Sequence, residues 1–402
     1  MNIPMTGLRP QLEATASQWQ ANLNRLFLRG QFILGEEVAA FEREFAQYLG
    51  SSWAAGVGSG TAALELCLRA AGVCRGRREV ITTVLTSPFT AQAIVAAGGR
   101  PRFADVDPRT LLIDADDACG RANRKTAAIV PVHLYGQPCD LRRLAVATAT
   151  LGIALVQDAC QAHGARFGGH AFTHYSQWVA YSFYPTKNLG CLGDGGAVVT
   201  DSRSIAEQVL LLRDGGRRGD QLSRVQAVHS RLDELQACYL RAFLPRLDEW
   251  NARRAKLAAL YDQALAGCEH VQPVRRSDES VNHLYVVRAQ RRDELRSYLL
   301  DLGITTGVHY PVPLHLHPAF QDCGAKKGAF PHAERACGEI LSLPLWPYLA
   351  DSDVLKVADL TRGFYCRGAA RPTPSPARSA PPESPRRAGL RLRRPSVRRR
   401  PG

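Results

Sequence analysis

Apolar residues in the middle of the chain fall into short continuous runs that alternate with stretches of helical spacing. From about Val80 the runs "EVITTVLT", "RPRFADVD", "TAAIVPVHLYG" and "IALVQDA" have the character of strands, and "TAQAIVAAGG" and "LRRLAVATATLG" have that of helices. This alternation predicts an α/β fold whose mainly parallel sheet lies between helices. Ligands of such folds bind at the carboxyl ends of the strands, so residues directly after each apolar run are the site candidates.

A long helical pattern follows Asp233, and Pro245 within it is expected to kink or divide the helix. The later stretch "HLYVVRAQRRDELRSYLLDLGITTGVHYPVPLH" then has the pattern strand, helix, strand. We therefore expect a large domain with an N-terminal helical segment over residues 1–250. A small C-terminal α/β domain should cover residues 251–366.

Composition excludes several classes of protein. No stretch of the 402 residues approaches the roughly 20 apolar residues of a membrane span, and the start "MNIPMTGLRPQLEA" lacks the layout of a signal peptide. The 11 cysteines are odd in number and form no Cys-x-x-Cys pair, so neither a metal site nor a disulfide framework is expected. A cytoplasmic location is the default.

The positive charge is concentrated at one end. Residues 367–402 hold eleven Arg and one Glu, a net of +10 that leaves about +4 of the total +14 for the rest of the chain. The segment is also rich in Pro and Ser, a composition that does not offset the entropy of ordering. We expect a disordered basic tail there, and nucleic-acid binding only through it.

The stretch "YSFYPTKNLGCLGDGGAVVTD" places a lone lysine, Lys187, between aromatic residues and glycines. A lysine near glycines is by itself most often a solvated surface charge. Three other features strengthen a chemical role for it, and each also has a plainer explanation.

The first feature is a Gly/Ser/Thr turn, "GSGT", before an amphipathic helix, where Gly60 and Thr61 would offer free N–H groups to a phosphate. An ordinary N-cap is the alternative. The second is Asp158, directly after an apolar strand, which either faces the ligand crevice or caps the next helix. The third is Ser182, five residues before Lys187, as a phosphate ligand or a solvated hydroxyl.

Together these features fit one ligand, pyridoxal 5'-phosphate. Its phosphate suits the helix start, its ring nitrogen suits Asp158, and its aldehyde forms a Schiff base with lysine. Burial in such a site would lower the pKa of Lys187 toward the range of an amine nucleophile.

At these residues the chain resembles the DegT/DnrJ/StrS family of pyridoxal-phosphate sugar aminotransferases. The resemblance runs from "FILGEEVAAFEREFAQYLG" through "DACQAHGA" and the lysine motif to "HYPVPLHLHPAF", over roughly residues 3–362. It implies a type I aminotransferase fold and a homodimer with active sites at the subunit interface. It also implies a glutamate or glutamine donor, and an acceptor keto group on a nucleotide-linked sugar or a cyclitol.

The resemblance also assigns residues. Lys187 would hold the cofactor and move the proton, Asp158 would pair with the ring nitrogen, and Gln161 would lie near the phenolic oxygen. Phosphate would be held by Ser182 and the backbone of Gly60 and Thr61. The substrate-side motif would be His309 and Tyr310.

The chain departs from the family pattern in two places within this region. His229 replaces the asparagine that reaches the phosphate in the partner subunit's site. The aromatic residue that stacks on the cofactor aligns near Ser87, so Phe89 is expected to substitute from a shifted position. The tail after Cys366 is unlike the family.

Two other functions compete with transamination. Related sugar dehydratases carry a histidine in place of the lysine, and Lys187 argues against that chemistry. The alternative from another class is a catalytically impaired regulatory protein that binds a polyanion through its Arg-rich tail.

Overall fold

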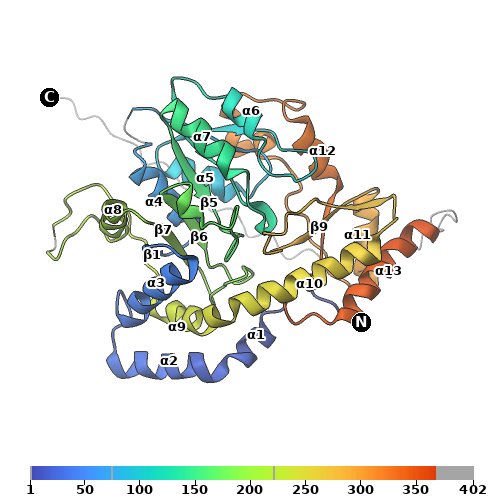
Figure 1. Ribbon diagram of the computed structural model, residues 1–402, viewed down its shortest axis with the longest axis horizontal. Coiled ribbons are helices and arrows are strands. Elements are labelled where there is room, and N and C mark those ends of the chain that lie inside the picture. The colour runs from blue at the N-terminus through green and yellow to red at the C-terminus, as the bar shows by residue number, and fades with distance from the viewer. Residues whose placement is uncertain (1, 74–75, 221, 368–402) are drawn as a thin grey trace, which may run out of the picture.

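The computed structural model describes residues 2–73, 76–220 and 222–367 (Figure 1). Its large sheet has seven strands in the order β1-β7-β6-β5-β4-β2-β3. Pairs within β6-β5-β4-β2-β3 are parallel, and β7 is antiparallel to both β6 and β1. The expected mainly parallel sheet is confirmed. The strands are β1 (Trp53–Val57), β2 (Glu79–Thr83), β3 (Arg100–Ala104), β4 (Thr126–Val130), β5 (Ala154–Asp158), β6 (Trp178–Ser182) and β7 (Gly196–Thr200).

Helices cover both faces of this sheet because alternate strand residues point to opposite sides. On β7, Val198 joins the core beneath α4 and α8, whereas Ala197 and Val199 join the core beneath α3 and α9 (Glu234–Phe243). Continuous apolar strands are therefore buried on both faces. The helices of this part are α1 (Arg9–Ala14), α2 (Ala16–Arg29), α3 (Glu36–Leu49), α4 (Gly60–Ala70), α5 (Pro88–Ala96), α6 (Ala115–Gly120), α7 (Leu141–Leu151) and α8 (Arg203–Arg213).

The long helical pattern forms two helices, α9 (Glu234–Phe243) and α10 (Leu247–Leu265), with a 3-10 turn at Leu244–Arg246 between them. Pro245 lies in that turn, so the predicted division is confirmed. Figure 1 shows α10 running from α9, below the large sheet, to α11 (Arg292–Asp301) and α13 (Asp351–Arg367) of the smaller unit. The expected domain boundary at residue 250 falls inside α10, where the chain continues without a loop; the boundary stays a prediction.

The smaller unit is built on a three-stranded antiparallel sheet in the order β10-β9-β8. Its elements are β8 (Val271–Pro273), β9 (Tyr285–Ala289), α11 (Arg292–Asp301), α12 (Pro331–Glu339), β10 (Ile340–Leu343) and α13 (Asp351–Arg367). The strand expected within "GITTGVHYPVPLH" is wrong. That stretch makes only isolated pairings at Ile304 and Gly307, and Pro311 and Pro313 lack the N–H that a strand interior needs.

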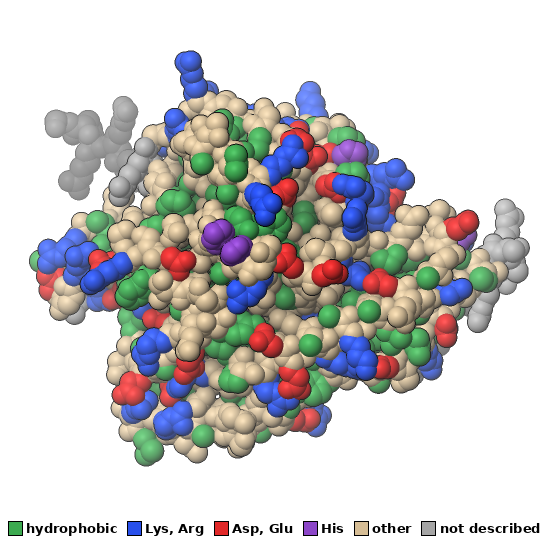
Figure 2. Space-filling view, viewed as in Figure 1, with side chains coloured by type: hydrophobic (Ala, Val, Ile, Leu, Met, Phe, Trp, Pro, Cys, Tyr) green, Lys and Arg blue, Asp and Glu red, His purple; other side chains and the backbone are tan. Residues whose placement is uncertain are grey.

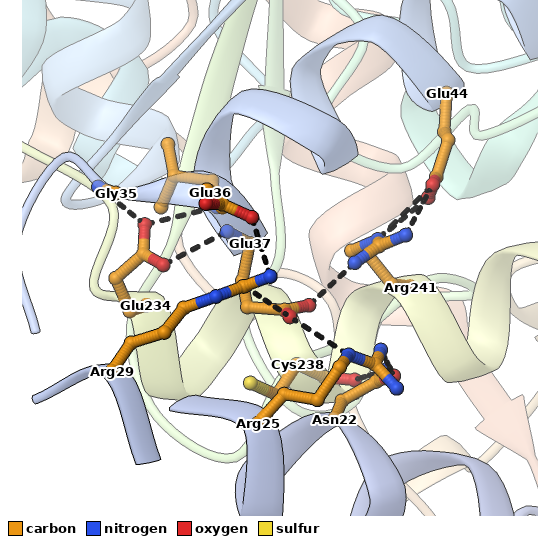
Figure 3. A network of polar contacts seen from close by, with 11 residues as sticks. Asn22, Arg25, Arg29, Gly35, Glu36, Glu37, Glu44, Glu234, Cys238 and Arg241 are labelled. Atoms are coloured by element: carbon orange, nitrogen blue, oxygen red, sulfur yellow. Dashed lines mark hydrogen bonds and ion pairs between the residues drawn. The ribbon is translucent and has the colours of Figure 1, made fainter. Parts of the chain in front are cut away.

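A buried polar network fixes the N-terminal helices and α9 to one another (Figure 3). Glu234 is 1% exposed and accepts hydrogen bonds from the backbone N–H groups of Gly35, Glu37 and Val38 at 2.8–3.0 Å, which caps α3. Glu37, also buried, pairs with Arg241 at 2.6 Å. Further ion pairs in the network join Arg25 and Arg29 to Glu37, Arg29 to Glu36, and Arg241 to Glu44.

Surface charge is mixed on the face in Figure 2, where Lys and Arg side chains lie among Asp and Glu. This agrees with the small net charge expected before residue 367. The predicted basic tail at residues 367–402 lies outside the described residues apart from Arg367, the last residue of α13. None of the described helices is both long enough and apolar enough to cross a membrane.

Candidate active site

A cavity of about 760 Å³ lies at the carboxyl ends of the central parallel strands. The small unit, α10 and the N-terminal segment complete its wall through residues such as His309, Arg254 and Met5. Nearly every residue that the sequence singled out lines this one cavity: Gly60, Thr61, Phe89, Asp158, Gln161, Ser182, Lys187, His309 and Tyr310.

Lys187 lies in the loop between β6 and β7, where its backbone N–H donates to the carbonyl of Tyr184 at 2.9 Å. Burial lowers the pKa of the Lys187 ammonium, and the nearby Cys160 and Asp158 partly oppose this shift. The lowered pKa favours the neutral amine, which is the nucleophilic form.

The residue after the lysine anchors this loop. Asn188 donates to the side-chain oxygen of Asn251 at 2.8 Å and to the carbonyl of Val281 at 2.9 Å, and its own oxygen lies 3.0 Å from Nδ1 of His283. Asn188 therefore links the lysine loop to α10 and to the segment before β9. No local pattern in the sequence indicates this role of Asn188, since its partners are far along the chain.

Asp158 ends β5 and is 5% exposed. Its Oδ2 accepts a hydrogen bond from the Thr90 hydroxyl at 2.8 Å, and its Oδ1 accepts one from the backbone N–H of Cys160 at 3.2 Å. Thr90 lies in the first part of α5 and was not predicted as a site residue. These two donors orient the carboxylate toward the cavity. Among the described residues no cationic side chain forms an ion pair with it.

The start of α4 forms a cradle for an anion. The Ser59 hydroxyl caps the helix by accepting from the N–H of Ala62, and the Ser59 carbonyl accepts from Ala63, which leaves the N–H groups of Gly60 and Thr61 for a ligand. A Cβ on Gly60 would lie 2.5 Å from Cβ of Ser182. Glycine therefore lets Ser182 approach the helix start closely, beside the same cavity.

Gln161 joins the two units across the cavity. Its Oε1 accepts from the backbone N–H of Tyr135 at 2.7 Å, and its Nε2 lies 3.4 Å from the hydroxyl of Tyr310. The Tyr135 hydroxyl donates to the carbonyl of His309. Burial lowers the pKa of His309 to about 4, and the charge of Lys187 acts in the same direction, so this imidazole is neutral at neutral pH.

The two departures from the family pattern lie in different places. Ser87 caps α5 and also lines the cavity, and Phe89 stands beside it with its side chain 63% exposed. His229 does not line this cavity; it borders a separate open hollow lined by Gly215 and residues 223–229. The structure thus does not bring His229 together with the other site residues of the same chain.

Two residues that the sequence did not indicate complete the far wall, Arg254 on α10 and His283 before β9. Both are buried, at 4% and 5% exposure. Burial lowers the pKa of His283 well below the ordinary value of histidine, and the charges of Lys187 and Arg254 add to the effect. Within the described ranges no group of three or more His, Cys, Asp or Glu could hold a metal ion.

Comparison with known proteins shows which family the chain matches. The model of the DegT/DnrJ/EryC1/StrS aminotransferase family matches residues 14–362. The dTDP-3-amino-3,4,6-trideoxy-alpha-D-glucose transaminase of Streptomyces venezuelae is 41% identical over 90% of this chain and 95% of its own length. A "Pleiotropic regulatory protein" of Geobacillus stearothermophilus is 39% identical over 91% of this chain and 99% of its own.

A solved structure is similarly close. The S. venezuelae protein DesV in complex with a ketimine intermediate superposes with a TM-score of 0.88 and 39% identity, over 92% of this chain and all of DesV. The fold, the cavity and these matches define an aminotransferase. The chain belongs to the DegT/DnrJ/EryC1/StrS aminotransferase family, so the resemblance, the fold class and the enzyme class predicted from the sequence are confirmed.

Proposed function

We propose that this aminotransferase uses pyridoxal 5'-phosphate to move an amino group from glutamate or glutamine to a keto group of a nucleotide-linked sugar or a related cyclitol. The observation that supports it most is that Lys187, Asp158 and the anion cradle at Gly60 line one cavity. Pyridoxal phosphate supplies an electron sink for the carbon next to the transferred nitrogen. Similarity to a nucleotide-sugar transaminase supports the acceptor class.

The residues of the cavity fit the cofactor end to end. The N–H groups of Gly60 and Thr61, with the Ser182 hydroxyl, would bind the phosphate. Asp158, which lacks a described cationic partner, would hold the protonated ring nitrogen. Gln161 would lie at the phenolic oxygen, and Phe89 against the ring face.

Lys187 would anchor the cofactor through its aldehyde and, once released as a free amine, would accept the proton of the substrate carbon and return it. Its lowered pKa suits both tasks, because the amine must be neutral to attack and to accept a proton. His309 and Tyr310 would contact the substrate from the small unit. Neutral His309 can accept a hydrogen bond from a sugar hydroxyl or donate one to it without adding charge.

A homodimer is part of the proposal. His229 lies away from the cavity of its own chain, as a residue serving the phosphate of a second copy should. Exposed apolar side chains at the end of α2 and beyond, Phe27 at 60%, Leu28 at 89% and Phe32 at 45%, are the kind of surface that a subunit interface covers.

The first experiment is an absorbance spectrum of the purified wild-type protein and of Lys187→Ala, with pyridoxal phosphate, before and after addition of glutamate. Wild type should show the visible band of the lysine-bound cofactor and lose it when glutamate is added. Lys187→Ala should lack this behaviour. A wild-type protein that never shows the band would contradict the proposal.

The relative named as a pleiotropic regulatory protein keeps the regulatory alternative in view. Its proposed polyanion contact would come from residues 367–402, nearly all of which lie outside the described residues. An absent cofactor band in the experiment above would favour this alternative over transamination.

A further inference from the structure

Arg254 is a buried cation without an acidic partner at the cavity wall. Its Nη1 donates to the backbone carbonyls of His283 at 3.3 Å and Leu345 at 3.0 Å. Its Nε is buried and has no hydrogen-bond partner. No carboxylate within the described part of the chain forms an ion pair with it.

Such an arrangement is costly unless something else pairs with the charge. A guanidinium removed from water loses hydration that two neutral carbonyls replace only in part. Burial lowers the pKa of Arg254 to about 10, so the side chain still carries its charge at neutral pH. A buried arginine at the edge of a cavity and without an acid is suited to bind an anion that enters from outside.

Neither acidic side chain that lines the cavity neutralises Arg254. Asp158 and Asp194 are the acidic side chains among the described lining residues. Asp158 accepts from Thr90 and Cys160, and Asp194 is exposed. Neither pairs with Arg254. The anion cradle at Gly60 is a separate feature, at the start of α4.

Arg254 and Lys187 are close enough to His283 for both charges to lower the pKa of that imidazole. The neutral ring of His283 thus lies near both the guanidinium of Arg254 and the amine of Lys187, and all three residues line the same cavity. An amino acid suits this arrangement. Its carboxylate can face the guanidinium of Arg254 while its amine, one carbon away, lies toward Lys187.

We propose that Arg254 binds a carboxylate of the amino-acid donor and so holds the donor amine toward Lys187. This inference rests on the proposed function, since it takes Lys187 as the reacting centre. A purely structural role, in which Arg254 only ties α10 to the backbone at His283 and Leu345, is the competing explanation.

The test uses Arg254→Lys, which keeps the charge but loses the planar fork, and Arg254→Gln, which keeps an N–H donor for the two carbonyls but loses the charge. Arg253→Lys is the matched control, because Arg253 is the preceding residue of α10, pairs with Asp351 at 2.6 Å and does not line the cavity. Two quantities are measured with cofactor bound: the glutamate concentration for half-maximal loss of the visible band, and the affinity for glutarate by calorimetric titration.

For both Arg254 variants we expect the glutamate concentration for half-maximal loss of the band to rise at least about tenfold. Glutarate should bind more weakly by a similar factor. Arg253→Lys should match wild type in both measurements. Variants that fold and keep wild-type glutamate and glutarate values would overturn the inference.

A measurement on the wild type alone covers the case in which the variants do not fold. Glutarate should bind and its uncharged diamide should not, and equal binding of the two would also overturn the inference. A wild type without the cofactor band would instead overturn the proposed function.

Discussion

Thr90 matters to the site through a single hydroxyl. It donates to Oδ2 of Asp158 at 2.8 Å, and the cavity holds that carboxylate in place with this bond and one backbone N–H. Threonine and valine have nearly the same shape, so Thr90→Val removes the bond and changes the packing little. The orientation of Asp158 then depends on its contacts with Cys160, whose backbone N–H donates to Oδ1 at 3.2 Å.

We expect Thr90→Val to weaken cofactor binding about tenfold, the usual worth of a hydrogen bond to a charged group. The measurement is equilibrium dialysis of pyridoxal phosphate. Thr82→Val is the control, because Thr82 also loses a buried bond, to the carbonyl of Val130 at 2.8 Å, without lining the cavity. Cofactor affinity of Thr90→Val equal to that of the control would show that Asp158 needs no such support.

Some site residues could be predicted from the sequence and others could not, for a physical reason. Asp158 directly follows an apolar strand and Lys187 precedes a glycine-rich loop, so short stretches reveal them. The partners that hold them are remote: Thr90 lies 68 residues from Asp158, and Asn251 lies 63 residues from Asn188. Arg254 resembles any other arginine of an amphipathic helix until folding buries it.

At the scale of elements, the capping of α3 by Glu234 connects the two ends of the large unit. α9, which starts at Glu234, also holds the loop after Lys187, since the side chain of Gln236 accepts from the backbone N–H of Leu192 at 2.9 Å. Through α9, the network drawn in Figure 3 is therefore connected to the loop that follows Lys187. None of its charged residues lines the cavity.

Glu234→Ala should lower the free energy of unfolding by about 3 kcal/mol, because three N–H groups at the start of α3 lose a buried charged acceptor. Glu36→Ala is the matched control in the same network; its partner Arg29 is exposed, and such a pair contributes about 1 kcal/mol or less. Urea unfolding of both variants measures the difference. Equal losses would contradict the assignment of Glu234 as the cap.

Elements were predictable where burial made the pattern strong. β2, β4 and β5 are buried on both faces, so continuous apolar runs marked them, and a shorter run marked the edge strand β3. β8 has three residues and is too short for a pattern, whereas "GITTGVHYPVPLH" looked like a strand but contains two prolines. The order of the strands follows from which faces meet after folding, which no single segment encodes.

At the scale of the whole molecule, several histidines are buried in neutral form. Burial lowers the pKa of His133 to about 4 and that of His163 to about 3; Lys187 adds to the second shift, and a contact with Gln157 opposes the first. The unfolded chain binds protons at these residues near pH 6.5, while the folded chain does not. Stability should therefore fall as the pH drops below about 6.5.

Between pH 7 and pH 5 the loss should be about 2 kcal/mol for each of His133 and His163, before most carboxylates begin to titrate. His163→Phe tests this directly, because both ring nitrogens of His163 lack partners and the ring packs against Tyr181 and Phe183. Phenylalanine keeps the ring and removes the titration. Urea unfolding at pH 7 and pH 5 should then show a pH-dependent loss about 2 kcal/mol smaller in the variant than in wild type. An unchanged pH dependence would mean that His163 does not take up its proton on unfolding, and that acid sensitivity arises elsewhere in the molecule.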